Sequence, residues 1–278
     1  MTQGVVVFAH NTDQVNYCLM AAWQARRINK YLDKPVSLIT DRASVNDLKS
    51  MGIAPYQYFD EVIINEEASE QTRKVGSEWV KFRNTDRVDA FRLSPYDETL
   101  LMDTDIFIAS NRLNRVWGNQ EDLLVSKKSR DLFNRKQGEF DYLKEHGVEF
   151  YWATECYFRK TEGVGTFFEA CRRVKRDYNW NSKVYGVPSQ PLRNDHVWSM
   201  ALHELGGKAH SKWAQPIPGT LTHCIDIDNL MGLTEDSAIV LGQVGDTDRV
   251  ATITGQDLHI MNKGDLMKYA QIELGVGA

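Results

Sequence analysis

TLLMDTDIFIA, the stretch from residue 99 to residue 109, places two carboxylates, Asp103 and Asp105, between two apolar runs. Short apolar runs of this kind are typical of strands buried in a sheet. In an extended segment the two carboxylates would point to opposite faces, but a turn at the end of a strand lets both reach one ion. Carboxylate oxygens suit Mg²⁺ or Mn²⁺. The stretch therefore predicts a divalent-cation site at the edge of a sheet.

The same D-x-D pattern recurs at residues 226–228 and 246–248. Only the copy at Asp103 follows a fully apolar run and precedes another, so we interpret the other two as chance occurrences in a chain rich in aspartate.

The predicted cation site suits the transfer of a sugar from a nucleoside diphosphate. The departing diphosphate carries extra negative charge, and a divalent cation that bridges its oxygens stabilises it. Sugar transfer is thus one reaction that such a site would suit.

Upstream, strand-like and helix-like segments alternate. Residues 4–9 are apolar and β-branched, residues 14–32 have the periodicity of a helix that Thr12 or Asp13 can cap, and residues 35–40 are again apolar. This order argues for a parallel sheet, in which ligands bind beyond the carboxyl ends of the strands. We predict an α/β fold with a mixed, mainly parallel sheet flanked by helices.

Phosphate-binding glycine loops are absent from the sequence. No G-x-G-x-x-G follows the first predicted strand, and no G-x-x-x-x-G-K occurs anywhere in the chain. A dinucleotide site of the Rossmann type and a P-loop are therefore excluded.

Three further segments frame the predicted site. Residues 84–93 have the pattern of a helix that Pro95 ends. Residues 179–193 hold one glycine and two prolines and are predicted to be a loop over the site. A second helix is predicted over residues 195–205.

The composition is that of a globular protein. The chain has 278 residues, 42% hydrophobic and 26% charged, and we expect a single domain. No apolar run approaches the ~20 residues that cross a bilayer, and no basic region precedes the first apolar stretch. We expect no membrane insertion and a cytoplasmic location. The scattered cysteines, Cys18, Cys156, Cys171 and Cys224, are interpreted as buried thiols.

The net charge is -5, which does not favour nucleic-acid binding by the molecule as a whole. Two local clusters are basic: Lys127, Lys128, Arg130, Arg135 and Lys136 in one, and Arg172, Arg173, Lys175 and Arg176 in the other. They are either solvated helix faces or contacts for a polyanionic acceptor such as DNA.

Residues 84–96 (NTDRVDAFRLSPY), followed by residues 99–105 (TLLMDTD), resemble the GT-A glycosyltransferases, particularly those of family eight. Residues 5–11 (VVVFAHN) look like the nucleotide-binding first strand of these enzymes. The overall pattern is also similar to small glycosyltransferases of tailed bacteriophages. The resemblance implies one GT-A-like domain, with residues 1–110 as a nucleotide-binding half and residues 111–278 as an acceptor-binding half.

The resemblance also implies roles for residues in the first half. Ala9, Asn11 and Tyr17 are expected to line the nucleoside, Arg87 to lie near the donor, and Thr104 to approach the ribose.

A third metal ligand is implied near the C-terminus, where His259 is the candidate. The family pattern is His-x-x-Gly-x-x-Lys, whereas here Lys263 follows the histidine at a shorter spacing. Lys263 remains able to reach a phosphate of the donor.

Asn194 and Asp195 are the candidates for direct participation in transfer, because GT-A enzymes carry an acidic or amide residue at the start of a helix across the site. An inverting enzyme would use it as a general base and a retaining enzyme for positioning. Alternatively, Asn194 or Asp195 is simply the N-cap of that helix.

These features together predict a glycosyltransferase that moves a hexosyl or pentosyl group from a UDP-type sugar to an acceptor hydroxyl with Mn²⁺ or Mg²⁺. Hydroxymethylated phage DNA is one candidate acceptor, and a phage enzyme would act in the host cytoplasm. A nucleotidyltransferase is an alternative, although the loop after the first strand lacks the glycines that hold a triphosphate. A carbohydrate-binding or DNA-binding protein with a degenerate transferase fold is another.

Overall fold

The computed structural model describes residues 1–67, 71–75, 78–135, 141–143, 147–189, 191–207 and 212–276. Its central element is a seven-stranded sheet with the order β13-β8-β12-β6-β1-β2-β3. The strands of this sheet are β1 (Gln3–Phe8), β2 (Val36–Thr40), β3 (Glu61–Ile64), β6 (Glu98–Met102), β8 (Leu123–Ser126), β12 (Trp152–Arg159) and β13 (Gln215–Pro216).

The central sheet is mixed but mainly parallel. β1 runs parallel to β2 and β6, and β2 runs parallel to β3. β12 runs antiparallel to β6 and β8, and β13 is parallel to β8. The predicted fold class is therefore confirmed.

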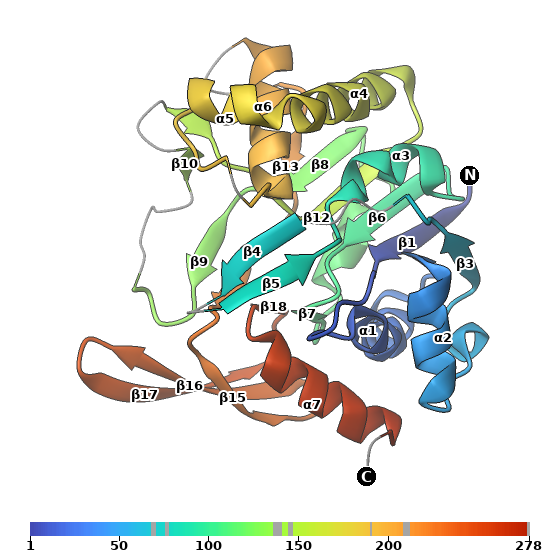
Figure 1. Ribbon diagram of the computed structural model, residues 1–278, viewed down its shortest axis with the longest axis vertical. Coiled ribbons are helices and arrows are strands. Elements are labelled where there is room, and N and C mark those ends of the chain that lie inside the picture. The colour runs from blue at the N-terminus through green and yellow to red at the C-terminus, as the bar shows by residue number, and fades with distance from the viewer. Residues whose placement is uncertain are drawn as a thin grey trace.

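Both faces of the sheet are covered, and the alternation of side chains along β1 shows why. Val5 and Val7 belong to one hydrophobic cluster, while Val6 and Phe8 belong to another. Because successive side chains of a strand point to opposite faces, a wholly apolar strand needs cover on both sides. Helices α1 (Tyr17–Leu32) and α7 (Lys263–Leu274) lie on one face, and α4 (Glu162–Arg176) and α6 (Asn194–Gly206) on the other (Figure 1).

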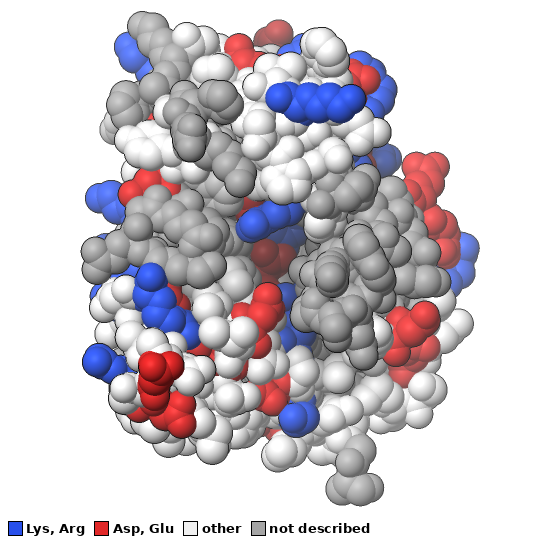
Figure 2. Space-filling model, turned by 60° about the vertical axis from the view of Figure 1, so that its left-hand side comes forward, with Lys and Arg blue, Asp and Glu red and all other residues white. Residues whose placement is uncertain are grey.

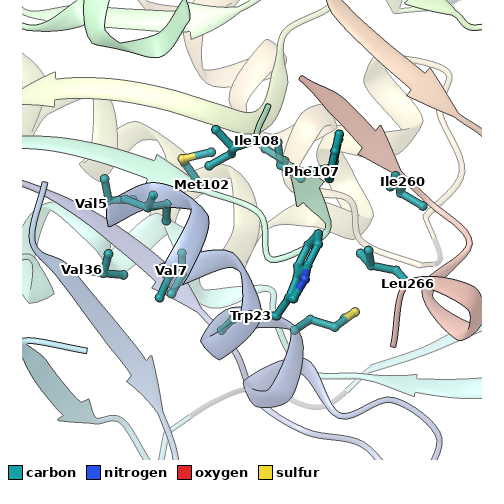
Figure 3. Packing of buried hydrophobic residues seen from close by; sticks show 14 of the residues in the cluster. Val5, Val7, Trp23, Val36, Met102, Phe107, Ile108, Ile260 and Leu266 are labelled. Atoms are coloured by element: carbon teal, nitrogen blue, oxygen red, sulfur yellow. The ribbon is translucent and has the colours of Figure 1, made fainter. Parts of the chain in front are cut away.

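The cluster on the α1 face joins the N-terminal and C-terminal parts of the chain. Trp23 of α1 stacks on Phe107, with ring centroids 6.3 Å apart. Around this pair lie Val7 of β1, Ile260 from the segment before α7, and Leu266 of α7 (Figure 3). The C-terminal segment is thus packed into the core beside the first helix.

The start of α1 differs from the prediction. Asn16, and neither Thr12 nor Asp13, is the N-cap, since its Oδ1 accepts a 2.8 Å hydrogen bond from Leu19 N. The Thr12 hydroxyl instead accepts from Val15 N within the preceding loop. The loop after β1 is consequently longer than predicted.

Residues 84–93 do not form the continuous helix that their pattern predicted. They form a 3₁₀ turn, η2 (Asp86–Asp89), followed by a single helical turn, α3 (Ala90–Leu93). Side chains of η2 are tied to distant elements, because Arg87 ion-pairs with Asp103 and Lys175 with Asp86. These tertiary contacts override the local helical preference.

The segment predicted to be a loop over the site is partly helical. It contains α5 (Tyr178–Val184), and Gln190 lies outside the described residues. The helix predicted over residues 195–205 is present as α6, with Gly207 in the left-handed conformation after its end.

A second, four-stranded sheet brings the C-terminal part of the chain to the D-x-D segment. Its order is β7-β18-β14-β9, where the strands are β7 (Ile106–Phe107), β9 (Ser129–Asp131), β14 (Leu221–Cys224) and β18 (Leu258–Ile260). β18 pairs antiparallel with β7, so that His259 lies opposite Ile106. This pairing decides the composition of the site described below.

The remaining elements lie around these sheets (Figure 1). They are α2 (Arg42–Ser50), η1 (Pro55–Gln57), β4 (Gln71–Val75), β5 (Glu78–Phe82), η3 (Arg112–Val116), β10 (Tyr142–Leu143), β11 (Val148–Glu149), β15 (Asn229–Leu233), β16 (Ser237–Val244) and β17 (Thr247–Thr254). All four cysteines are buried and free, as predicted. Within the described ranges, no helix combines the length and the apolar character needed to cross a bilayer.

Candidate functional site

A cleft of about 530 Å³ opens beside the ends of β6, β12 and β18. Figure 2 shows a hollow in one face of the molecule where acidic and basic side chains meet. Nine of the residues predicted for the site line the cleft: Tyr17, Arg87, Asp103, Thr104, Asp105, Asn194, Asp195, His259 and Lys263. The lining residues come from both halves of the chain.

Three potential metal ligands converge in this cleft. Asp103 follows β6, Asp105 precedes β7, and His259 lies in β18. One ligand atom from each lies within 4.8 Å of the others. Two carboxylates and an imidazole are a suitable donor set for a divalent first-row cation.

The backbone around the acidic pair is held by hydrogen bonds. Asp103 N donates to Thr154 O at 2.9 Å, and Ile260 N donates to Asp105 O at 2.9 Å. Gln24 of α1 donates from Nε2 to Asp103 O at 2.6 Å. The turn between the two carboxylates is therefore fixed from three directions.

Asp105 is a buried carboxylate with cationic neighbours. Lys263 Nζ lies 2.8 Å from its Oδ2, and His259 Nε2 lies 3.4 Å from its Oδ1. Burial disfavours the charged form, but Lys263 and His259 outweigh it and hold the pKa of Asp105 well below its ordinary value. Its Oδ1 is buried and accepts no hydrogen bond. An ionised carboxylate with a buried oxygen that accepts no hydrogen bond fits a bound cation.

Asp103 has a different environment. Arg87 Nη2 ion-pairs with its Oδ1, while Arg87 Nη1 donates to Ala153 O at 2.6 Å. Burial raises the pKa of Asp103 to about 6, assisted by the charge of Asp105 and opposed by Arg87. The two carboxylates of the D-x-D segment thus differ in their readiness to ionise, as expected for close like charges.

His259 is buried beside Asp105. Burial lowers the pKa of its imidazole, but Asp105 outweighs burial, so that the pKa is raised from its ordinary value. Its other ring nitrogen, Nδ1, lies 3.0 Å from Nδ1 of His223.

Asn194 and Asp195 lie across the cleft at the start of α6. Neither is the N-cap, because Arg193 holds that position. Asp195 accepts from Ala153 N at 2.9 Å and from Arg193 Nη2 at 2.9 Å. Asn194 Nδ2 donates to Asn84 O at 2.9 Å, and Asn194 Oδ1 is buried with no hydrogen-bond partner. The alternative that either residue merely caps the helix is therefore wrong.

Two of the residues predicted to line a nucleoside are not among the cleft residues. Ala9, directly after β1, is fully buried. Asn11 accepts from Cys18 N at 2.9 Å and donates to Asp47 at 2.9 Å, so its side chain joins α1 to α2. Tyr17 and Thr104 do line the cleft. The roles of all four toward a nucleoside stay predictions.

The other two D-x-D copies have different surroundings. Asp226 is exposed and lines the cleft, whereas Asp228 is buried and receives two hydrogen bonds from Arg135, both 2.8 Å long. The copy at 246–248 begins in the turn between β16 and β17, where Gly245 has a φ of +60°, and continues into β17. Each of these copies therefore overlaps a turn.

Sequence reasoning left twelve cleft residues unassigned: Phe8, Asn84, Trp152, Ala153, Thr154, Pro191, Leu192, Arg193, Ile225, Asp226, Ile227 and Met261. Asn84 begins the segment 84–96, and Pro191, Leu192 and Arg193 belong to the segment 179–193 that was predicted to lie over the site, so membership of these segments was an available signal. The segment 225–227 overlaps the D-x-D copy at residues 226–228, which had been interpreted as a chance occurrence, and only the tertiary structure brings it to the cleft.

The two basic clusters are largely balanced by carboxylates. The ion pairs join Lys127 to Glu149, Arg135 to Asp131 and Asp228, Arg172 to Glu169 and Asp89, Arg173 to Glu204, Lys175 to Asp86, and Arg176 to Asp177. Lys136 lies outside the described residues. Charge that is already paired attracts a polyanion less strongly. A DNA acceptor therefore stays a prediction without support from these clusters.

No protein-family model matches the sequence, and no curated protein matches it. Solved structures with a similar fold include galactosyltransferase LgtC in complex with donor and acceptor sugar analogues, with a TM-score of 0.45 and 13% identity over 77% of this chain and 72% of the other. Glycosyltransferase GlyE of Streptococcus pneumoniae TIGR4 has a TM-score of 0.45 and 11% identity over 77% of this chain and 45% of that one.

A putative glucose-1-phosphate thymidylyltransferase from Bacillus anthracis has a TM-score of 0.46 and 9% identity over 79% of this chain and 87% of the other. Glycosyltransferases and a nucleotidyltransferase thus resemble the chain to the same modest degree. These likenesses do not assign an activity, which has to be argued from the residues of the cleft.

Proposed function

We propose that this protein is a metal-dependent glycosyltransferase that moves a sugar from a UDP-type nucleotide sugar to an acceptor hydroxyl. The convergence of Asp103, Asp105 and His259, with ligand atoms within 4.8 Å of one another in a cleft, carries the proposal. The closer resemblance to family eight and to phage enzymes rests on the sequence pattern alone.

These three residues would hold Mn²⁺ or Mg²⁺, which when bound neutralises charge on the oxygens of a departing diphosphate. Lys263 and Arg87 add positive charge to the lining of the cleft. In this structure each of them pairs with a D-x-D carboxylate. A bound diphosphate offers Lys263 a second anionic partner, and such charge-assisted contacts stabilise a leaving group as its charge develops.

The start of α6 suits positioning of the sugar rather than removal of a proton. Both oxygens of Asp195 are engaged, one by Ala153 N and the other by Arg193. Asn194 Oδ1, in contrast, is a buried acceptor without a partner among the described residues. We therefore assign Asn194 to a hydroxyl of the donor sugar and Asp195 to the orientation of Arg193, which is the arrangement expected of a retaining transfer.

The division of labour between the two halves of the chain is part of the proposal. Residues 1–110 supply Tyr17 and Thr104 toward the nucleotide. Residues 111–278 supply Arg193 and Ile227 to the lining of the cleft, and we assign these two residues to the acceptor.

A nucleotidyltransferase would also need a cation on these ligands, and a binding protein would need the cleft but no turnover. The two alternatives differ from the proposal in what they do with a sugar nucleotide. A nucleotidyltransferase forms the sugar nucleotide from a nucleoside triphosphate and a sugar phosphate, while a binding protein leaves it intact.

The test is a thermal-shift screen of UDP-, GDP-, ADP- and CMP-sugars, each with Mn²⁺ and with EDTA. A ligand that binds only the folded state stabilises it and so raises the melting temperature. At a ligand concentration of about a hundred times Kd, the free energy of unfolding increases by about 2.7 kcal/mol. We expect a shift with a UDP-sugar and Mn²⁺ that EDTA abolishes. Release of free UDP then separates an enzyme from a binding protein. Absence of any metal-dependent shift would overturn the proposal.

A further inference from the structure

Two histidines from neighbouring strands form a buried pair behind the proposed metal site. His223 of β14 and His259 of β18 are register partners in the second sheet. Their Nδ1 atoms lie 3.0 Å apart, and the two residues are 1% and 6% exposed. The pair therefore forms a hydrogen bond shielded from solvent.

A hydrogen bond between two ring nitrogens has one donor and one acceptor. His259 presents Nε2 toward Asp105 Oδ1, at 3.4 Å. A cation held by Asp105 and His259 needs a lone pair on this Nε2, so the single proton of a neutral His259 ring has to be on Nδ1. His223 Nδ1 is then the acceptor, and the proton of His223 is on its Nε2.

The ring of His223 is held in place by its surroundings. It lies against the indole of Trp152, with centroids 4.1 Å apart and planes inclined by 35°. Trp152 Nε1 donates to Ser129 Oγ at 3.0 Å, which fixes the indole. A buried ring packed in this way keeps its Nδ1 directed at His259.

We propose that His223 is a positioning residue for the metal site: it accepts the Nδ1–H of His259 and thereby holds the tautomer in which His259 Nε2 is free to bind the cation. Carboxylates and backbone carbonyls usually have this role behind a metal-bound histidine, and their loss weakens metal affinity about 10- to 100-fold. The inference rests on the proposed metal site, but it assigns His223 a task that the three ligands do not define.

Asparagine and leucine at position 223 provide a matched comparison, because they are close in shape and differ in the acceptor. The Oδ1 of asparagine lies near the place of the histidine Nδ1 and accepts a hydrogen bond, whereas leucine cannot. We expect His223→Leu to weaken Mn²⁺ binding about 10- to 100-fold. His223→Asn should stay within about threefold of the wild-type protein, since the acceptor is restored.

The measurement is Mn²⁺ titration followed by the electron paramagnetic resonance of the free ion, without nucleotide or turnover. Melting temperatures of both variants show whether the fold is retained. If the role of His223 were only structural, both variants would lose stability and their Mn²⁺ affinities would not differ. Equal affinities of the two variants would overturn the inference.

The ¹⁵N spectrum of histidine-labelled wild-type protein loaded with Zn²⁺ gives a second readout that needs no variant to fold. We expect a proton on Nδ1 of His259 and on Nε2 of His223. A proton on Nδ1 of His223 would overturn the inference. If the wild-type protein binds neither Mn²⁺ nor Zn²⁺, the proposed function fails and the inference fails with it. If it binds them and the leucine variant binds equally well, only the inference fails.

Discussion

Lys263 Nζ lies 2.8 Å from Asp105 Oδ2. The lysine begins α7, and the aspartate precedes β7. The ammonium group of Lys263 is thus paired with Oδ2 of Asp105. The other oxygen of this carboxylate, Oδ1, has no hydrogen-bond partner. Asp105 can therefore bind a cation through Oδ1 while Oδ2 remains with Lys263, and Lys263 lies where it can also meet a phosphate.

Replacement of Lys263 by methionine should slow sugar transfer without abolishing metal binding. A fixed charge that stabilises a leaving oxygen contributes about 10²- to 10³-fold to turnover, so we expect kcat to fall by about 100-fold. Steady-state kinetics with a UDP-sugar measure this. Lys268→Met is the control, because Lys268 lies on the same helix and is 71% exposed. An unchanged kcat in Lys263→Met would remove Lys263 from the reaction.

Loss of the carboxylate at position 105 should weaken cation binding strongly. Asp105→Asn removes a charged ligand of the proposed cation. Loss of a residue that only holds a metal ligand in place weakens metal binding about 10- to 100-fold. Loss of the ligand itself should cost more, so we expect Mn²⁺ affinity to fall at least about 100-fold. Isothermal titration calorimetry measures the change. Asp226→Asn is a matched control, because Asp226 lines the same cleft and also belongs to a D-x-D pattern, but is not one of the three converging ligands. Equal losses in both variants would indicate a diffuse electrostatic effect instead of a coordination site.

Arg87 should stabilise the fold as well as the site. Its side chain is 3% exposed and it pairs with Asp103. Arg87→Met leaves the Asp103 carboxylate without its partner. We expect the free energy of unfolding to fall by about 3 kcal/mol, the lower end of the range for a broken buried ion pair. The lower end applies because the Asp103 side chain is 32% exposed. Urea unfolding in EDTA measures the loss. Arg92→Met, at a side chain that is 59% exposed, should cost less than about 0.5 kcal/mol. A loss at Arg87 as small as that at Arg92 would contradict the assignment.

The assignment of Asp195 to positioning has a kinetic consequence. Asp195→Asn keeps an oxygen for Ala153 N but loses the charge that holds Arg193. We expect kcat to fall by about 10-fold, whereas loss of a general base costs about 10² to 10⁴. The stereochemistry of the product, read by proton NMR, should show retention of the anomeric configuration. An inverted product together with a loss above a thousandfold would mean that Asp195 is the base.

Asp41 should make the stability depend on acid pH. It caps α2 by accepting from Ser44 N at 2.7 Å and pairs with Arg83 at 2.8 Å. Burial acts to raise the pKa of Asp41, but the Ser44 hydrogen bonds and Arg83 outweigh burial and lower it from 3.8. Because the folded pKa is below the unfolded one, the stabilisation is complete above the unfolded value and disappears as the pH falls through the folded value.

Asp41→Asn keeps the cap, since asparagine caps as well as aspartate, but removes the charge. We expect the free energy of unfolding of the variant to be lower by about 2 kcal/mol at about pH 7. This is the contribution of a hydrogen bond to a charged group. The difference should shrink as the pH falls through the lowered pKa of Asp41. Guanidinium unfolding across this range measures it, and a difference that does not change with pH would contradict the prediction.

Much of the fold followed from local pattern. The apolar runs of β1, β2 and β6 predicted buried strands, because a strand covered on both faces has few polar positions. The bounds of α6, Asn194–Gly206, likewise agree closely with the helix predicted over residues 195–205. The pattern failed at residues 84–93, where Arg87 and Asp86 form ion pairs with distant residues that a helical periodicity does not encode.

The sequence by itself determined that Asp103 and Asp105 lie together, because one residue separates them at the end of an apolar strand. It could not determine which distant side chains join them. His259 was proposed only through a family resemblance whose spacing the chain does not keep, and His223 was not proposed at all. The tertiary structure decided both, since β18 pairs with β7 on one side and with β14 on the other. Strand pairing depends on long-range hydrogen bonds and shared burial, and these leave no signature in the residues nearby.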